Sequence, residues 1–338
     1  MKKFINNVDN MLLESLSGFA SAHQDIVQLS LNPHFVTRKL KATNKVAIIS
    51  GGGSGHEPLH AGYVGLGMLD AACPGYVFTS PTPDQMLAAA DVVHANKGVL
   101  FIVKNYAGDV MNFEMATEMM PFECVTVLTS DDCAVINSTY TTGRRGVAGT
   151  LIVEKCVGSM AESGANLQAC KTLGDKVNHN TASIGVALTS CIVPAAGRPT
   201  FDISETELEM GVGIHGEPGR RREAMREADL IVKDMVAAII EDLETRLNLP
   251  KSLADKHKEI LLLVNGFGAT PLMELYLLYN SAEKLLSHHG FMVRRCLVGN
   301  YVTALDMAGA SISVCLLDEE IKQNWDSPVH TAGLRWGI

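Results

Sequence analysis

The chain of 338 residues is 47% hydrophobic and 19% charged, with a formal net charge of −9. This length and apolar content predict a globular protein with a large core, long enough for two domains. The negative charge and the lack of a long Lys/Arg stripe exclude a typical nucleic-acid-binding surface. No apolar stretch reaches the ~18 residues of a membrane-spanning helix. The N-terminus also turns polar too soon for a signal peptide.

The eight cysteines are scattered along the chain, with no C-x-x-C pair and no Cys/His pair at zinc spacing. We therefore predict reduced thiols in a cytoplasmic protein. No cluster of carboxylates of the kind that Mg²⁺ prefers is present either. The sequence thus predicts no metal site on this chain.

Short apolar runs alternate with helical patterns, which predicts an α/β fold of two α/β domains with mainly open sheets. In the first half we expect strands over 45–50, 99–103 and 125–128, and helices over 84–95, 111–119, 149–163 and 166–178. In the second half we expect strands over 183–189, 259–264, 291–298 and 311–316, and helices over 223–243 and 271–287. A polar turn at 178–181 places the expected domains at 1–181 and 182–338. The polar stretch 246–258 is the one linker-like segment.

A glycine-rich run, 51–57 (GGGSGHE), follows the first expected strand. It lacks the Gly-Lys-Ser/Thr ending of a P-loop and the spacing of G-x-G-x-x-G. One interpretation is a tight strand-to-helix turn that needs glycine backbones. The other is a nest of backbone N–H groups, at Gly53, Ser54 and Gly55, that binds a small hydroxylated ligand. His56 would then be placed to hydrogen-bond that ligand.

Asp109 follows the expected strand 99–103, in the run Lys104-Asn105-Tyr106-Ala107-Gly108-Asp109. It could end a turn or cap the following helix, and Lys104 could be a solvated lysine at a strand end. Several polar groups at one strand end exceed what a cap requires. A carboxylate in a partly desolvated pocket is a credible base for a substrate hydroxyl.

His215 lies between glycines in the run 211–219 (GVGIHGEPG), which can bring an imidazole close to a small molecule. A turn histidine with satisfied hydrogen bonds and a metal ligand are the alternatives, and the lack of paired ligand spacing disfavours the metal. A neutral imidazole nitrogen can add to a ketone and form a carbinolamine. Such a bond would distinguish a ketone from its alcohol analogue.

The expected layout brings these residues together. Ligands of open α/β sheets bind at the carboxyl ends of the strands, so His56 and Asp109 should lie at one sheet edge. His215 belongs to the second half, which predicts a substrate pocket at strand ends near the domain interface. The run 142–146 (TGRRG) could bind an anion at a helix N-terminus or form a surface turn, and we leave it unassigned.

Taken together, these motifs resemble the substrate-binding subunit of dihydroxyacetone kinases, the DhaK family, in particular its type that depends on the sugar phosphotransferase system. The resemblance extends over essentially the whole chain. The stretches that carry it are 51–58 (GGGSGHEP), 79–85 (TSPTPDQ), 104–109 (KNYAGD), 142–147 (TGRRGV), 193–199 (VPAAGRP), 213–219 (GIHGEPG) and 265–276 (NGFGATPLMELY).

The resemblance implies phosphoryl transfer to a hydroxyl of dihydroxyacetone, the glycerone of glycerol metabolism. His215 is similar to the histidine that binds the substrate carbonyl covalently as a hemiaminal. Asp109 is similar to the general base, and His56 to the histidine that hydrogen-bonds the substrate and assists transfer. Gly53 and Lys104 match positions that line the pocket.

The resemblance also implies partners, and no cofactor held by this chain itself. Family members that use ATP alone carry a nucleotide-binding domain on the same chain. We therefore expect a separate nucleotide-binding kinase subunit, with ADP or ATP and magnesium, which a phosphotransferase-system protein would rephosphorylate. A homodimer of this chain is expected too.

A second interpretation is a non-catalytic paralogue that binds dihydroxyacetone and acts as a sensor or transcriptional coactivator. Such a protein could keep His215 for capture. The presence of both His56 and Asp109 favours the enzyme, because a transferase needs a base. An unrelated α/β-hydrolase is disfavoured, since the chain lacks a G-x-S-x-G nucleophile elbow.

Overall fold

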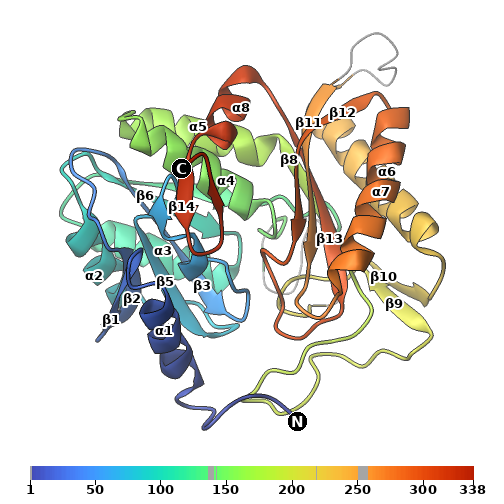
Figure 1. Ribbon diagram of the computed structural model, residues 1–338, viewed down its shortest axis with the longest axis horizontal. Helices are drawn as coiled ribbons and strands as arrows, with labels where there is room; N and C mark the ends of the chain where they lie inside the picture. The colour runs from blue at the N-terminus through green and yellow to red at the C-terminus, as the bar shows by residue number, and fades with distance from the viewer. Residues whose placement is uncertain (1, 136–140, 142, 218, 250–257) are drawn as a thin grey trace.

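The structure is a computed structural model that describes residues 2–135, 141, 143–217, 219–249 and 258–338. This part of the chain forms two large open sheets and one small sheet, with helices between and outside them (Figure 1). The α/β fold with open sheets is the one that the sequence predicts. Most of the expected linker at 246–258 lies outside the described residues.

The first sheet has the strand order β1-β2-β5-β3-β6-β7. Strands β5, β3, β6 and β7 are parallel, and β1 and β2 are antiparallel additions at one edge. The strand bounds are β1 (Val27–Leu31), β2 (His34–Arg38), β3 (Ala47–Ser54), β5 (Ala71–Val77), β6 (Val99–Lys104) and β7 (Cys124–Thr129).

Helices cover both faces of this sheet, and every residue of β3 and β6 is therefore buried. Side chains alternate between the two faces. Ile48 and Leu100 pack in the core shared with α4 and α5, whereas Ile49 and Phe101 pack in the core shared with α2 and α3. The helix bounds are α2 (Pro83–Val93), α3 (Ala107–Met119), α4 (Thr150–Glu162) and α5 (Leu167–His179).

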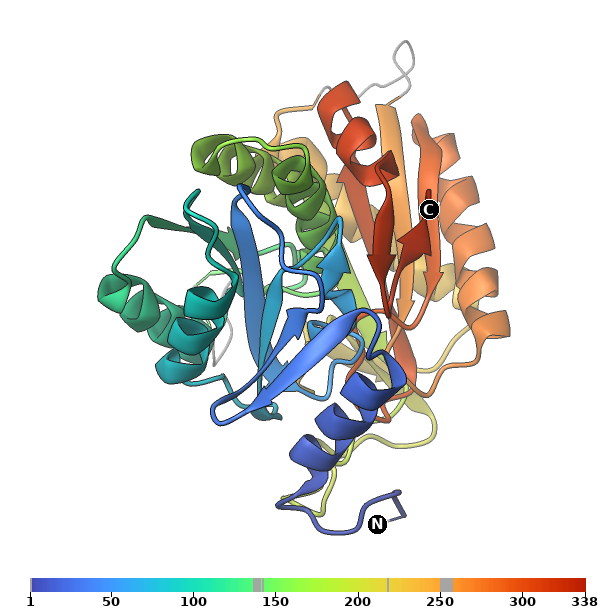
Figure 2. The same ribbon diagram turned by 60° about the vertical axis from the view of Figure 1, so that its left-hand side comes forward.

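The second sheet has the order β10-β9-β8-β13-β11-β12, with one parallel pair, β11 and β12. Its strands are β8 (Thr181–Ala187), β9 (Glu207–Met210), β10 (Arg221–Ala224), β11 (Lys258–Gly266), β12 (Phe291–Gly299) and β13 (Gly309–Leu316). Helices α6 (Ala228–Arg246) and α7 (Leu272–His288) cover its outer face. Leu261 and Leu263 of β11 point the other way, into the core that also holds α4. Helices α4 and α5 thus lie between the two large sheets (Figure 2).

The C-terminal residues return to the first half of the chain. After α8 (Glu319–Asp326), strand β14 (Val329–Thr331) pairs with both β15 (Arg335–Trp336) and β4 (Gly65–Leu66). Helix α1 (Met11–Ala22) and a short 3₁₀ helix (Ala61–Tyr63) complete the first half. The two large sheets are formed by the chain before and after the expected boundary near 181. Strand β14, however, comes from the second half and pairs with β4 of the first half. The division into two domains stays a prediction.

Several expected elements differ from the structure in their bounds. The helix expected at 223 begins at Ala228, because Arg221–Ala224 pair with β9 as a strand. The helix expected at 111 already begins at Ala107, and the strand expected over 183–189 spans 181–187. Helix α2 begins at Pro83, where Thr82 and Gln85 form a capping box.

No helix in the described part of the chain is both long and apolar enough to cross a membrane.

Two helical glycines provide a matched test of packing. A Cβ added at Gly158 in α4 would lie 2.4 Å from the Met68 Cα, whereas one added at Gly18 in α1 would meet no atom within 4 Å. We expect Gly158→Ala to lower the free energy of unfolding by about 1–3 kcal/mol through overpacking. Gly18→Ala should raise it by about 0.5–1 kcal/mol, since alanine favours a helix. Urea denaturation measures both, and a Gly158→Ala protein as stable as wild type would contradict this packing.

Candidate active site

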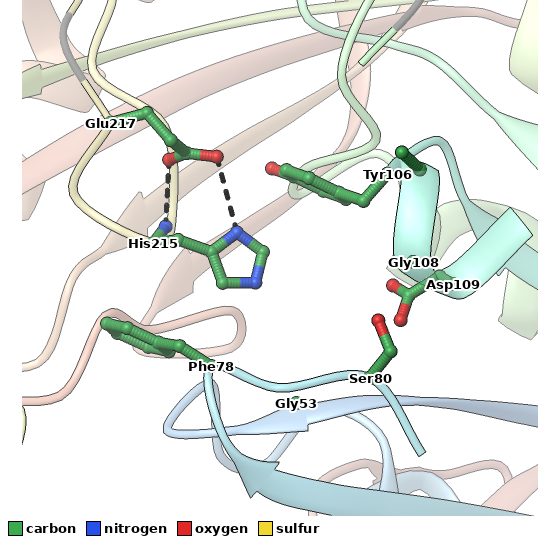
Figure 3. Close-up of a pocket in the computed structure, with 9 residues that line it drawn as sticks. Gly53, Phe78, Ser80, Tyr106, Gly108, Asp109, His215 and Glu217 are labelled. Atoms are coloured by element: carbon green, nitrogen blue, oxygen red, sulfur yellow. Dashed lines mark hydrogen bonds and ion pairs between the residues drawn. The ribbon is translucent and has the colours of Figure 1, made fainter. Parts of the chain in front are cut away.

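A pocket of about 420 Å³ opens between the two halves of the chain. Gly53 lies at the end of β3, Phe78 and Ser80 follow β5, and Asp109 follows β6, so three parallel strands direct their carboxyl ends toward it. His215 follows β9 of the second sheet. Figure 3 shows these groups around one cavity. The full lining is Gly53, Phe78, Ser80, Tyr106, Ala107, Gly108, Asp109, His215 and Glu217.

The glycines at the end of β3 allow close approaches that any side chain would block. A Cβ added at Gly53 would lie 2.6 Å from the backbone nitrogen of Thr79, and one added at Gly52 would lie 2.1 Å from the Nζ of Lys104. The Ser54 hydroxyl donates to the Gly75 carbonyl at 2.7 Å, and the Gly55 N–H donates to the Glu57 carboxylate at 3.0 Å. Of the four residues of this run that are expected to bind the ligand, Gly53, Ser54, Gly55 and His56, only Gly53 lines this pocket.

His56 is fully buried, and its ring lies 4.6 Å from that of His215 between ring centroids. Its Nδ1 is 2.8 Å from the Thr303 carbonyl, and a carbonyl only accepts, so Nδ1 carries the proton. Burial, with the charges of His215 and Lys104, holds the pKa of His56 well below 6.5. Its neutral Nε2 therefore keeps a lone pair, and this buried atom has no hydrogen-bond partner in the protein.

Asp109 lies in the first turn of α3, whose N-cap residue is Tyr106. It is therefore not the cap of that helix. The carboxylate is buried, with Oδ2 3.6 Å from the Lys104 Nζ and with Oδ1 unpartnered. One carboxylate oxygen is thus free to accept a proton from a bound molecule.

A chain of buried groups, which sequence reasoning missed, supports Lys104. Its Nζ lies 3.0 Å from the Nε2 of His60, and the His60 Nδ1 lies 2.6 Å from the Glu154 Oε1. Burial and the charges of Lys104 and His56 hold the pKa of His60 well below 6.5. Neutral His60 therefore accepts from Lys104 and donates to Glu154. The available signal was Glu154 itself, a carboxylate inside the apolar helix expected at 149–163.

The carboxylate of Glu217 holds His215 by two hydrogen bonds, drawn as dashed lines in Figure 3. The His215 backbone N–H donates to Oε2 at 3.0 Å, and Nδ1 lies 3.3 Å from Oε1. Aromatic rings flank the imidazole, with centroid distances of 4.5 Å to Tyr106 and 5.2 Å to Phe78. The other ring nitrogen, Nε2, faces the pocket.

The ionisation of Glu217 decides which imidazole nitrogen carries the proton. Burial alone would raise the pKa of this side chain, but the hydrogen bond and charge of His215 and the Arg145 guanidinium bring it to about 2. An ionised carboxylate only accepts hydrogen bonds, so the Nδ1 of His215 is the donor. In neutral His215, Nε2 then carries a lone pair directed into the pocket.

Together these groups can add a nucleophile to a carbonyl and remove a proton from a hydroxyl. Within the described residues, no group of three His, Cys, Asp or Glu side chains could hold a metal ion. The run 142–146 presents no free cation to an anion in its described part, because Arg144 binds Asp242 and Arg145 is fully buried. Thr142 itself lies outside the described residues.

Fold and site define a member of a kinase-related family. Residues 17–333 match the Dak1 domain, and the chain belongs to the Dak1 domain family. Over 359 residues, and 100% of both chains, it is 45% identical to the dihydroxyacetone-binding subunit DhaK of the PEP-dependent dihydroxyacetone kinase of Escherichia coli (strain K12). This relationship supports a kinase, as the sequence predicts.

Two solved structures share the fold. The dihydroxyacetone kinase of C. freundii superposes with a TM-score of 0.86 at 31% identity, over 99% of this chain and 60% of that one. The dihydroxyacetone kinase operon co-activator Dha-DhaQ superposes with a TM-score of 0.85 at 32% identity, over 95% and 96% of the two chains. The fold therefore occurs both in a kinase and in a co-activator.

The buried Glu154 predicts a pH dependence of stability. Burial, only partly offset by Ser50 and Lys104, raises the pKa of this carboxyl from 4.5 to about 8. The stability that its protonation contributes is complete below pH 4.5 and is lost as the pH rises toward 8. The free energy of unfolding of Glu154→Gln should therefore rise relative to that of wild type, by up to about 1.4 kcal/mol for each pH unit in this interval. Denaturation series at several pH values measure the difference.

Glu241, an exposed residue of α6, provides the matched control for this series. Glu241→Gln should follow wild type at every pH. If Glu154→Gln also follows wild type, Glu154 is not a buried acid.

Proposed function

We propose that this chain is the dihydroxyacetone-binding subunit of a dihydroxyacetone kinase. It captures the ketone as a hemiaminal on His215 and positions a hydroxyl for phosphorylation. The observation that carries the proposal is the free Nε2 of His215, fixed by Glu217 and directed into a pocket that also holds the unpartnered oxygen of Asp109.

Capture is an addition of the His215 imidazole to the ketone carbonyl, in which no group leaves. The Nε2 lone pair attacks the carbonyl carbon, a C–N bond forms, and the carbonyl π bond becomes a lone pair on oxygen. That oxygen takes up a proton and Nδ1 gives one up, so the hemiaminal is neutral. Glu217 lies against Nδ1 and stabilises the imidazolium that forms in between. An alcohol cannot react in this way, so capture selects the ketone.

Transfer needs a base at the terminal hydroxyl. Asp109 Oδ1 has no protein partner and accepts the hydroxyl proton as the oxygen attacks phosphorus. The bond between that phosphorus and the bridging oxygen of the donor breaks, and the donor leaves without its phosphoryl group. Lys104, 3.6 Å from the other oxygen, balances the carboxylate charge. The free Nε2 of His56 accepts a hydrogen bond from the substrate and helps to orient it. The covalent bond aligns the hydroxyl before the phosphoryl group arrives.

The phosphoryl group comes from a separate nucleotide-binding subunit in this proposal. Phosphoryl transfer needs positioning and neutralisation of phosphate charge by magnesium, which that subunit would supply with its ADP or ATP. The relative from Escherichia coli is named as PEP-dependent, and this supports rephosphorylation through the sugar phosphotransferase system. We extend the proposal to a homodimer that acts in the cytoplasm.

The structural similarity to the co-activator Dha-DhaQ supports a second candidate function. A co-activator could use the same capture by His215 as a sensor of dihydroxyacetone. A sensor has no need for a proton acceptor at the hydroxyl. The free oxygen of Asp109 and the free Nε2 of His56 therefore favour the kinase subunit.

His215→Ala should abolish covalent capture, because the proposed C–N bond forms at Nε2 of His215. Intact-mass measurement of the protein with dihydroxyacetone checks this, and glycerol should give no adduct with any form. His289→Ala, which removes an exposed histidine after α7, is the matched control and should keep the adduct. An adduct on His215→Ala would refute capture at His215.

Asp109→Asn should keep the adduct and slow transfer by about 100- to 10,000-fold, the usual contribution of a positioned base. A coupled assay of dihydroxyacetone phosphate formation measures transfer, with the nucleotide-binding subunit and the phosphotransferase relay present. Asp91→Asn, at an exposed site on α2, should leave the rate unchanged.

Normal turnover by Asp109→Asn would exclude Asp109 as the base. The wild-type chain should form product only with the partner subunit. If it captures dihydroxyacetone but forms no product with ATP alone, with the partner or with the relay, the co-activator function is the better one.

A further inference from the structure

Arg145 is the largest fully buried side chain in the described part of the chain, and it comes from the run that sequence analysis left unassigned. Its guanidinium lies 2.6 Å (Nε) and 2.5 Å (Nη2) from Oδ2 of Asp132, and Nη2 also donates to the Gly211 carbonyl at 2.6 Å. Nη1 makes no hydrogen bond. Asp132 balances the charge of the guanidinium, but this ion pair leaves Nη1 unused.

The free side of Arg145 lies next to Glu217. A Cβ added at Gly213 would lie 2.8 Å from the Arg145 Nη1 and 2.1 Å from the Glu217 Oε2, so both groups converge on this glycine. Gly213 thus leaves open the space between the cation and the carboxylate, which interact through their charges without a hydrogen bond. Arg145 itself is not among the residues that line the pocket.

The charge of Arg145 has a direct consequence for Glu217. A carboxyl group that is 4% exposed favours its neutral form unless a cation lies nearby. Arginine remains charged at any pH at which a protein is folded. Arg145 therefore helps the hydrogen bond from His215 to keep Glu217 ionised, and only an ionised Glu217 obliges the Nδ1 of His215 to be the donor.

We propose that Arg145 is a positioning residue for ketone capture. It keeps Glu217 ionised, and this fixes the His215 tautomer whose Nε2 is a nucleophile. The effect on capture rests on the proposed function, whereas the tautomer of His215 can be observed in the protein without substrate. A protonated Glu217 would donate to Nδ1, and the proton of the imidazole would then block Nε2.

Loss of the Arg145 charge raises the proton affinity of the Glu217–His215 pair, whichever of the two takes the proton. Either protonated form lacks a free Nε2. As the pH is lowered, Arg145→Gln should therefore lose capture at a higher pH than wild type does. The pH at which half of the capture is lost should rise by about 1–3 units, the usual effect of a charge at this range. The charged and titratable groups that face the Glu217–His215 pair and Arg145 are Tyr106, Asp132 and His56.

The experiment measures adduct formation by intact mass from about pH 5 to about pH 8 in wild type and three variants. Arg145→Lys keeps the charge and should retain nearly the wild-type midpoint, whereas Arg145→Gln should shift it. Arg144→Gln, beside Arg145 but paired with Asp242, is the matched control and should not shift. A purely structural role would affect Arg145→Lys and Arg145→Gln alike and leave the midpoint in place, which would overturn the inference.

A second measurement needs no substrate, and its wild-type arm tests the inference even if Arg145→Gln does not fold. Nitrogen NMR shifts of labelled histidine report the tautomer, and the signal missing from His215→Ala identifies His215. An Nε2–H tautomer in wild type overturns the inference outright. An Nδ1–H tautomer that is lost in Arg145→Gln supports it, even if dihydroxyacetone forms no adduct, in which case only the proposed capture fails.

Discussion

The hydrogen bond between His215 and the buried carboxylate of Glu217 is the constraint on which the site depends. It fixes the tautomer of the imidazole, and with the rings of Tyr106 and Phe78 it fixes the direction of Nε2. A carboxylate is expensive to bury, so the surroundings must stabilise it. The buried guanidinium of Arg145 meets this need and in turn requires Asp132. One nucleophilic nitrogen thus depends on a line of alternating charges that extends away from the pocket.

A second line of buried polar groups ends at Asp109 of the pocket. Glu154 binds His60, His60 binds Lys104, and Lys104 lies beside Asp109. Both lines end at a group with a free position, the Nε2 of His215 and the Oδ1 of Asp109. In a low-dielectric interior such lines hold their geometry well when every member is paired. Oε2 of Glu154 and Nη1 of Arg145 also lack a hydrogen-bond partner, but the free atoms of His215 and Asp109 belong to residues that line the pocket.

The sequence predicts the elements that are continuous apolar runs, such as β3, β6 and β11, because strands buried on both faces contain little else. It misses β5, since AACPGYV carries few β-forming residues, and it begins a helix at 223, over the last two residues of β10, whereas α6 begins at Ala228. Glycine-flanked histidines and a strand-end aspartate indicate the site. His60, Glu154 and Arg145 could not be assigned, because their partners lie far away in sequence and only the fold brings them together.

The two halves of the site are joined by segments that are late in the chain. Backbone N–H groups of Thr303 and Leu305 donate to the carbonyls of His56 and Gly55, and β14 pairs with β4. A chain that grows from its N-terminus on the ribosome can form the first sheet, with Asp109 and Lys104 in place, long before these segments emerge. The loop that carries His56 obtains its hydrogen bonds to Thr303 and Leu305 only when these residues have been made. Complete assembly of the pocket is therefore one of the last events in the synthesis of this protein, and a prematurely ended chain would carry the base without an anchored histidine beside it.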